Sequence, residues 1–228
     1  MNAKHRMWLS NVEPRFLFDL DGTLVDSVYQ HVHAWKRALD AEGIELSMWR
    51  IHRRIGMSGQ LPRETGREMD AGLVERLRER HAFAYQEQAA SLRPLPGARE
   101  LLATLSSSGI GWAIATSGRM QTAAAGLGAL GVDPASTPVV TRDQVKRAKP
   151  DPDLFLAACE RLGGPIETAV VVGDSIWDML AATRCRAFGV GVLSGGYGAD
   201  ELRQAGAIHV YEDPADLLVH LDEVIGQR

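Results

Sequence analysis

Residues 16–24 read Phe-Leu-Phe-Asp-Leu-Asp-Gly-Thr-Leu, an apolar run that ends in two aspartates separated by one residue. The apolar start predicts a buried β-strand. Asp19 and Asp21 would then follow its carboxyl end, where parallel α/β sheets place their active sites. Alternation along an extended chain would turn both carboxylates the same way, and a hard cation such as Mg²⁺ would relieve their repulsion. The alternative is a strand that ends in an ordinary Asp-Gly turn.

The composition is typical of a globular protein. The chain has 228 residues, 45% of them hydrophobic and 24% charged, which suits one domain with an insertion or two small domains. A net charge of −4 argues against a nucleic-acid binder. No apolar run is long enough to span a membrane, and residues 1–15 lack the apolar segment of a signal peptide. We therefore expect a cytoplasmic monomer or homodimer that binds neither nucleic acid nor membrane, with Cys159 and Cys185 as reduced thiols.

Strand and helix patterns alternate in the second part of the chain, which predicts a parallel sheet with helices on both faces. Beyond the first strand, strands are expected at residues 110–115, 137–141, 168–172, 187–193 and 207–211. The last helix is expected at residues 214–221.

An all-helical segment interrupts this pattern directly after the first strand. One helix is expected to end at Gly43, and an amphipathic helix is expected at about residues 72–90, with Leu73, Leu77 and Phe83 on one side. The basic residues 49–56 between these helices show no strong periodicity. We expect an extension at residues 1–15, an α/β core at residues 16–26 and 93–228, and a helical cap at residues 27–92 that can close over the site.

Several chemistry-bearing residues follow the predicted strands or precede helices. Thr116, Ser117 and Gly118 follow one strand, Lys149 precedes a helix, and Asp174 and Asp178 follow a later strand. Phosphoryl transfer needs such a set, because cations neutralise the equatorial oxygens, hydroxyls and backbone N–H groups orient them, and a carboxylate can attack.

These motifs resemble the four signatures of the haloacid dehalogenase (HAD) superfamily. Residues 19–27 match the first signature, Thr116 the second, Lys149-Pro150 the third and residues 173–178 the fourth, in the family's order. The helical insertion resembles the cap of the phosphoglycolate phosphatase-like and β-phosphoglucomutase-like branch. The resemblance implies a Rossmann-like parallel sheet with an inserted helical cap.

The resemblance also implies roles for individual residues. Asp19 would attack phosphorus, and Asp21 would protonate the leaving alcohol and then activate water. Thr116, with Ser117 and Gly118, and Lys149 would bind the phosphoryl group. Mg²⁺ would be bound by Asp19, by the backbone carbonyl of Asp21 and by Asp174. Asp178 would either support the metal shell through water or hold Lys149. The dehalogenase members of the superfamily lack an acid at the position of Asp21, so its presence argues against dehalogenase chemistry.

The cap resembles that of β-phosphoglucomutase around His31, which would reach the site when the cap closes; the alternative is a partly buried helical histidine. The fourth motif has Gly173 where the mutase has Glu, and Gly59 falls where the mutase has its phosphate-gripping arginine. Both differences favour a phosphatase over a phosphosugar mutase, which stays the alternative.

Other cap and loop residues leave two interpretations open. Arg53 and Arg54 can grip a substrate anion or lie on a solvated helix face. Arg119, after the second motif, can contact the substrate or be exposed. Residues 57–60 align with the loop that contacts substrate in this branch, and a plain turn is the alternative.

Two further functions agree less well with the sequence. A phosphonate hydrolase would need a Schiff-base lysine in the cap loop, whereas Lys36 on the first cap helix is the only lysine within residues 27–92. A receiver-like phospho-acceptor module would lack both the insertion and an acid placed like Asp21. We therefore expect a Mg²⁺-dependent phosphatase of a small phosphorylated metabolite, whose identity the sequence leaves open.

Overall fold

Six parallel strands form the central sheet of the computed structural model, which describes residues 14–57 and 69–226. The strand order is β5-β4-β1-β6-β7-β8. The strands are β1 (Arg15–Phe18), β4 (Trp112–Ala115), β5 (Val139–Val140), β6 (Ala169–Gly173), β7 (Phe188–Val192) and β8 (Ala207–Tyr211). The predicted α/β fold with a parallel sheet is confirmed. Most of residues 1–15, expected as an extension, lie outside the described residues, and β1 already begins at Arg15.

Strand β1 is the centre of the sheet because it pairs with β4 on one side and β6 on the other. Leu17 lies level with Ala113 of β4 and with Val171 of β6. The residues that follow these three strands therefore emerge side by side at the carboxyl edge of the sheet. This order brings Asp19, Thr116 and Asp174 to one place.

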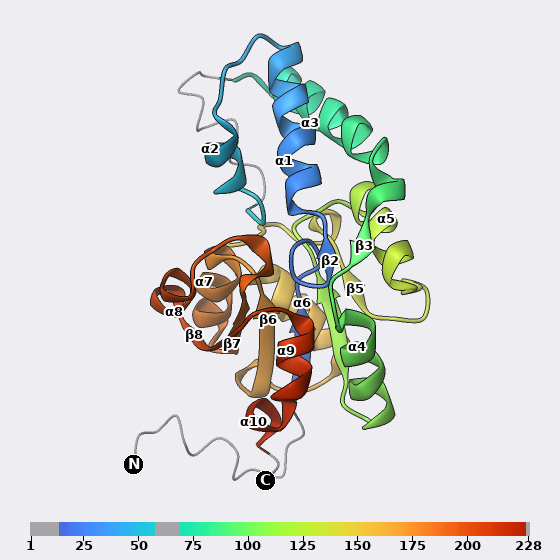
Figure 1. Cartoon of the computed structure of the whole chain (residues 1–228), viewed down its shortest axis with the longest axis vertical. Helices are drawn as coiled ribbons and strands as arrows, with labels where there is room; N and C mark the ends of the chain where they lie inside the picture. Colours follow the sequence, from blue (N-terminus) through green and yellow to red (C-terminus); the bar gives the residue numbers. More distant parts are fainter. Residues whose placement is uncertain (1–13, 58–68, 227–228) are drawn as a thin grey trace.

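Helices cover both faces of the sheet (Figure 1). The core helices are α4 (Ala98–Ser107), α5 (Met120–Leu130), α6 (Asp153–Leu162), α7 (Ile176–Cys185), α8 (Ala199–Ala205), α9 (Pro214–Val219) and α10 (Leu221–Ile225). Phe16 and Phe18 pack in one apolar cluster with α4, α5 and α9, whereas Leu17 packs in another with α6 and α7. Alternate residues of β1 are thus buried on opposite faces, as a period of two requires. Cys159 and Cys185 are buried free thiols, as expected.

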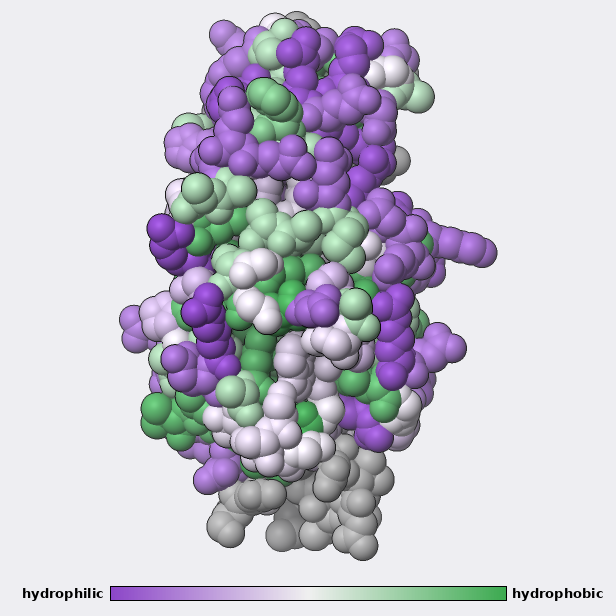
Figure 2. Space-filling view, turned by 90° about the vertical axis from the view of Figure 1, so that its right-hand side faces the viewer, coloured by the Kyte–Doolittle hydropathy of each residue, from purple (hydrophilic) through white to green (hydrophobic). Residues whose placement is uncertain are grey.

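Among the residues that the structure describes, three cap helices stand above the carboxyl edge of the sheet: α1 (Val28–Ala41), α2 (Met48–His52) and α3 (Ala71–Gln86) (Figure 1). Helices α1 and α3 lie side by side and share an apolar cluster that includes Val32, Leu39, Ile51 and Leu77. On the face shown in Figure 2, hydrophilic residues dominate this end of the molecule, and more apolar surface lies over the sheet-containing part.

The chain enters and leaves the cap through two short antiparallel strands, β2 (Val25–Asp26) and β3 (Arg93–Pro94). These two-residue strands were not predicted, because so short a segment has no periodicity to detect. Helix α2, within the basic segment, was not predicted either. The amphipathic helix ends at Gln86 and is followed by a 3₁₀ turn, η3 (Ala89–Ser91).

The extents of two elements and the exposure of one residue also differ from the sequence expectations. The strand expected at residues 137–141 is reduced to Val139–Val140. The last expected helix is divided into α9 and α10 at His220. Phe83, expected on the apolar side of α3, is 64% exposed, because the buried side of that helix carries Leu77, His81 and Tyr85 instead. Over the described residues, no helix is both long and apolar enough to cross a membrane.

Candidate active site

Asp19 and Lys149 form a buried ion pair at the carboxyl end of β1. The Asp19 backbone N–H donates to the Val172 carbonyl at 2.9 Å, which fixes the residue directly after the strand. Lys149 Nζ lies 2.5 Å from Asp19 Oδ1 and 2.8 Å from Asp178 Oδ1. One ammonium group is therefore shared by two buried carboxylates.

Asp174 adds a third carboxyl group, so that Asp19, Asp174 and Asp178 form an acidic cluster. One carboxyl oxygen from each of these residues lies within 4.8 Å of one from each of the others. Thr23 Oγ1 donates to Asp174 Oδ1 at 2.8 Å, and Ser175 Oγ donates to Asp178 Oδ2 at 2.5 Å. Burial raises the pKa of Asp19 to about 7 and the pKa of Asp174 well above its usual value. Two of the three buried carboxyl groups pair with Lys149, and together the three offer hard oxygen ligands whose ionised forms Mg²⁺ would stabilise.

The carboxylate of Asp21 lies outside this cluster and faces the cap. Its Oδ1 atom accepts from Ser27 Oγ at 2.6 Å and from Tyr85 OH at 3.4 Å, and lies 3.2 Å from His31 Nε2. Burial alone would raise the pKa of Asp21, but the electrostatic interaction with His31 and the hydrogen bonds from His31 and Ser27 outweigh it and lower that pKa.

The expectation that strand alternation makes the Asp19 and Asp21 carboxylates converge on one cation therefore needs correction. Strand β1 ends at Phe18, and the chain turns before Asp21. Its side chain consequently joins residues of α1 and α3, while Asp19 joins Asp174.

A cavity of about 390 Å³ opens between the carboxyl edge of the sheet and the cap. Asp19 and Asp21 of the first motif line it, as do Thr116, Ser117 and Gly118. The buried Ser117 Oγ has no hydrogen-bond partner among the described residues, so this hydroxyl can bind a ligand oxygen. From the cap, the lining includes His31, Trp35, Arg54, Glu75, Arg78, Glu79 and His81.

The three arginines that the sequence left open occupy different places. Arg54 lines the cavity, and its guanidinium lies 5.6 Å from the centre of the Trp177 ring. Arg119 lines it too and pairs with Glu75 of the cap at 3.2 Å. Arg53 does not line the cavity, since its guanidinium lies over the Tyr197 ring and pairs with Glu201 at 2.6 Å.

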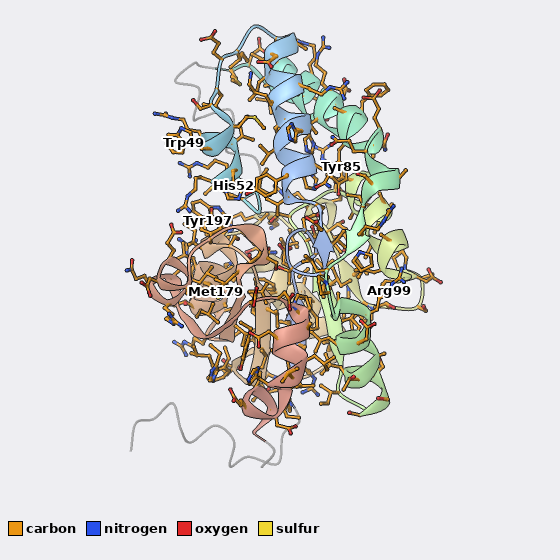
Figure 3. The ribbon with its side chains drawn as sticks, viewed as in Figure 1. Trp49, His52, Tyr85, Arg99, Met179 and Tyr197 are labelled. Carbon is orange, nitrogen blue, oxygen red and sulfur yellow. The ribbon has the colours of Figure 1, made fainter. Side chains whose placement is uncertain are left out.

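The end of α2 contacts the sheet-containing part beside the site. His52 Nε2 lies 2.8 Å from the Gly195 carbonyl oxygen, and the His52 and Tyr197 side chains lie close together at this junction (Figure 3). Tyr197 OH and Trp177 Nε1 both donate to the Arg53 carbonyl oxygen. Residues 58–60 of the expected substrate loop, including Gly59, lie outside the described residues.

Sequence reasoning missed Tyr85 and His81, both of which contact His31. The two residues are four apart on α3 and continue the buried stripe of Leu77, so helical periodicity was the available signal. Trp177 and Tyr197 were missed because their roles depend on a contact with α2 that no local pattern reveals.

Comparisons with known proteins agree with this geometry. A family model described as haloacid dehalogenase-like hydrolase matches residues 15–186. The chain belongs to the haloacid dehalogenase-like hydrolases. It is 37% identical to hexitol phosphatase A of Escherichia coli over 162 residues, which cover 70% of this chain and 74% of that protein. It is 30% identical to N-acetylmuramic acid 6-phosphate phosphatase of Pseudomonas aeruginosa, with 92% and 95% covered.

A solved structure also resembles the chain closely. The crystal structure of a hydrolase from Pseudomonas syringae has a TM-score of 0.90 and 57% sequence identity, and the match covers 93% of this chain and 99% of the other. The fold expected from the four signatures is therefore confirmed for this HAD hydrolase.

Proposed function

We propose that this HAD hydrolase is a Mg²⁺-dependent phosphatase that acts through an aspartyl phosphate on Asp19. The observation that carries the proposal is the different setting of two aspartates that line one cavity. Asp19 faces Lys149 in the acidic cluster, whereas Asp21 is held apart by Ser27 and His31. Such a division suits one carboxylate that attacks and another that transfers protons. The relatives that are named phosphatases support the same class of reaction.

In the first step, a carboxylate oxygen of Asp19 attacks phosphorus and the bond between phosphorus and the ester oxygen breaks. Asp21 is ionised in the free protein, so it must take up a proton together with the bound substrate, and it gives this proton to the departing alkoxide. Lys149 orients Asp19 and offsets its charge, while Thr116 and Ser117 with the Gly118 backbone bind the phosphoryl oxygens. Asp178, which pairs with Lys149, is assigned to holding that lysine.

In the second step, Asp21 takes a proton from water and the water oxygen attacks phosphorus. The bond between phosphorus and the Asp19 oxygen breaks, which releases inorganic phosphate and restores the free carboxylate. Ser27 and His31 keep Asp21 at the boundary of cap and core for both transfers, since each contacts its Oδ1 atom.

The acidic cluster fits a magnesium ion, as its burial and excess negative charge indicate. Asp19, Asp174 and the backbone carbonyl of Asp21 would hold the ion, which would supply positive charge to the phosphoryl oxygens. Burial raises the pKa of Asp19 and Asp174 in the metal-free protein, so their protons compete with the ion and binding should strengthen as the pH rises toward 8.

The replacement Gly195→Ala tests this metal site. A Cβ atom at position 195 would lie 1.7 Å from Asp174 Oδ2, so the carboxylate must move. We expect the affinity for Mg²⁺ to fall by about tenfold or more, as when groups that orient metal ligands are altered. Calorimetric titration measures it, with Gly198→Ala as the control, because within the described part of the chain the only atom within 4 Å of that Cβ is Glu201 Oε2, at 3.5 Å. Equal affinities in the two variants would contradict the assignment of Asp174.

The substrate class that we propose is a small phosphorylated sugar or sugar alcohol. The cap side of the cavity carries both carboxylates and guanidinium groups, among them Glu75, Glu79 and Arg78, which can accept from and donate to several hydroxyl groups. The named substrates of the two relatives, a hexitol phosphate and an amino-sugar phosphate, agree with this class.

The decisive experiment measures phosphate released from hexitol phosphates, hexose 6-phosphates, N-acetylmuramic acid 6-phosphate and phosphoglycolate, each with and without Mg²⁺. We expect metal-dependent release that is fastest with a sugar or sugar alcohol phosphate. No release from any compound, by folded protein that binds Mg²⁺, would contradict the phosphatase proposal.

The mutase alternative is tested in the same assay. The 3.2 Å contact between His31 and Asp21 keeps it open, because a histidine matching His31 assists β-phosphoglucomutase. Interconversion of glucose phosphates that needs a bisphosphate activator and releases little phosphate would favour the mutase.

A further inference from the structure

His81 of α3 lies directly behind His31 as seen from Asp21. His31 Nδ1 and His81 Nε2 are 3.0 Å apart, while Nε2 on the other side of the His31 ring lies 3.2 Å from Asp21 Oδ1. Three residues from different elements therefore form one line, Asp21–His31–His81. Both nitrogens of the His31 ring are engaged, as a buried imidazole requires.

Aromatic rings hold this line in place from both sides. The Tyr85 ring stacks on His31 with centroids 3.9 Å apart, and the Trp35 ring stacks on His81 with centroids 4.2 Å apart. The planes of the two histidine rings differ by 16°. Because α1 supplies His31 and Trp35, and α3 supplies His81 and Tyr85, the stack joins the two long cap helices above Asp21.

A carboxylate only accepts hydrogen bonds, so Nε2 of His31 must carry the hydrogen that faces Asp21. Whether Nδ1 of His31 also carries a hydrogen then depends on the group that it faces, which is His81 Nε2. Burial and the nearby His31 hold the pKa of His81 well below its usual value, which keeps that ring neutral. A neutral imidazole has one donor and one acceptor nitrogen. His81 can therefore donate to a neutral His31 or accept from a protonated one.

We propose that His81 is a positioning residue that holds the His31 ring with Nε2 directed at Asp21. It acts through His31 and touches neither Asp21 nor the reacting atoms. The inference rests on the proposed function, because it concerns the aspartate that transfers protons. The competing interpretation is that His81 only fills space between α1 and α3 as part of the stack.

Two replacements separate a hydrogen-bonding role from a packing role. His81→Phe keeps a flat ring against Trp35 but leaves His31 Nδ1 without a partner. His81→Gln loses the ring but keeps an amide that can donate or accept. His33→Gln, at an exposed position of α1, is the matched control for a histidine removed from the same pair of helices.

With a hexitol 6-phosphate as the substrate, we expect His81→Phe to lower kcat about tenfold, as loss of an orienting partner does, with KM changed less than about twofold. His81→Gln should recover most of kcat, and His33→Gln should match the wild type. Unchanged kcat in His81→Phe, or equal losses in the Phe and Gln variants, would overturn the proposal. Thermal melting of each variant shows whether a loss of kcat comes from unfolding.

A second measurement needs no turnover. In the wild type, the ring N–H hydrogens of the Asp21–His31–His81 line should give slowly exchanging NMR signals. Those of His31 should be lost in His81→Phe and retained in His81→Gln. Retention in the Phe variant would overturn the proposal. A wild type that keeps these signals yet releases no phosphate would contradict the proposed function and leave the positioning of His31 by His81 standing.

Discussion

Asp19→Asn is expected to lower the rate of phosphate release by about 10⁴-fold or more, as removal of a nucleophile does in other enzymes. An amide oxygen attacks phosphorus far more weakly than a carboxylate, and the amide cannot form the acyl phosphate. The fold should persist, because Lys149 keeps its 2.8 Å ion pair with Asp178. Steady-state phosphate release with Mg²⁺ measures the loss, and a melting curve confirms the fold.

The matched control for this experiment is Asp26→Asn, which removes an exposed carboxylate from the same motif. It should retain the wild-type rate, because the side chain lies in β2 and is directed to solvent. Residual activity of Asp19→Asn within about tenfold of the wild type would mean that another group attacks phosphorus, which would refute the aspartyl-phosphate mechanism.

Lys149→Met is expected to damage both activity and stability. The lysine is 1% exposed and is the shared partner of Asp19 and Asp178, so its loss leaves buried carboxylates without their cation. We expect the free energy of unfolding to fall by about 3–5 kcal/mol, the usual cost of breaking a buried pair. Phosphate release should fall by about 10³-fold or more, since both the nucleophile and the transferred group lose a positive partner. Urea unfolding and phosphate assays measure the two effects.

The stability loss in Lys149→Met should depend on pH in a defined direction. The pKa of Asp19 is already raised from 3.8 to about 7 in the metal-free wild type, mainly by burial. A folded state that binds protons more tightly than the unfolded chain loses stability as the pH rises through this interval. Removing the ammonium raises that pKa further. The deficit should therefore be largest near pH 8 and smaller near pH 5.

Urea unfolding at both pH values, in the presence of a chelator, tests this direction. Lys146→Met is the control, because it removes an exposed lysine three residues away in the chain. A Lys149→Met deficit that is the same at both pH values would show that unpaired carboxylates are not its cause.

Much of the fold was predictable because its signals are local. The buried run before Asp19 and the five later strand patterns gave a parallel sheet, and four of those patterns correspond closely to β4, β6, β7 and β8. Lys149 has no strand signal of its own. Its place before a predicted helix grouped it with the candidate phosphoryl-transfer residues, and the resemblance implied its role beside Asp19.

Other features could not be predicted, because they depend on partners distant in the sequence. Helix α2 is five residues long, and its last residue, His52, contacts Gly195. Arg53 and Arg54 are adjacent and identical in chemistry, yet one binds Glu201 and the other lines the cavity. Tyr85 reaches Asp21 only because α3 packs along α1.

The sequence by itself determined the α/β class, the position of the helical insertion and the residues available for chemistry, because strand periodicity and motif order are properties of a linear chain. Only the tertiary structure decided which of those residues lie beside Asp19 and which lie beside Asp21. Strand order placed Asp174 beside Asp19, since β1 and β6 are neighbours in the sheet although about 150 residues separate them in the chain. Cap packing placed His31 and Tyr85 against Asp21, because α1 and α3 bury a common apolar stripe above it. Such distances follow from the packing of whole elements, which no local pattern of residues encodes.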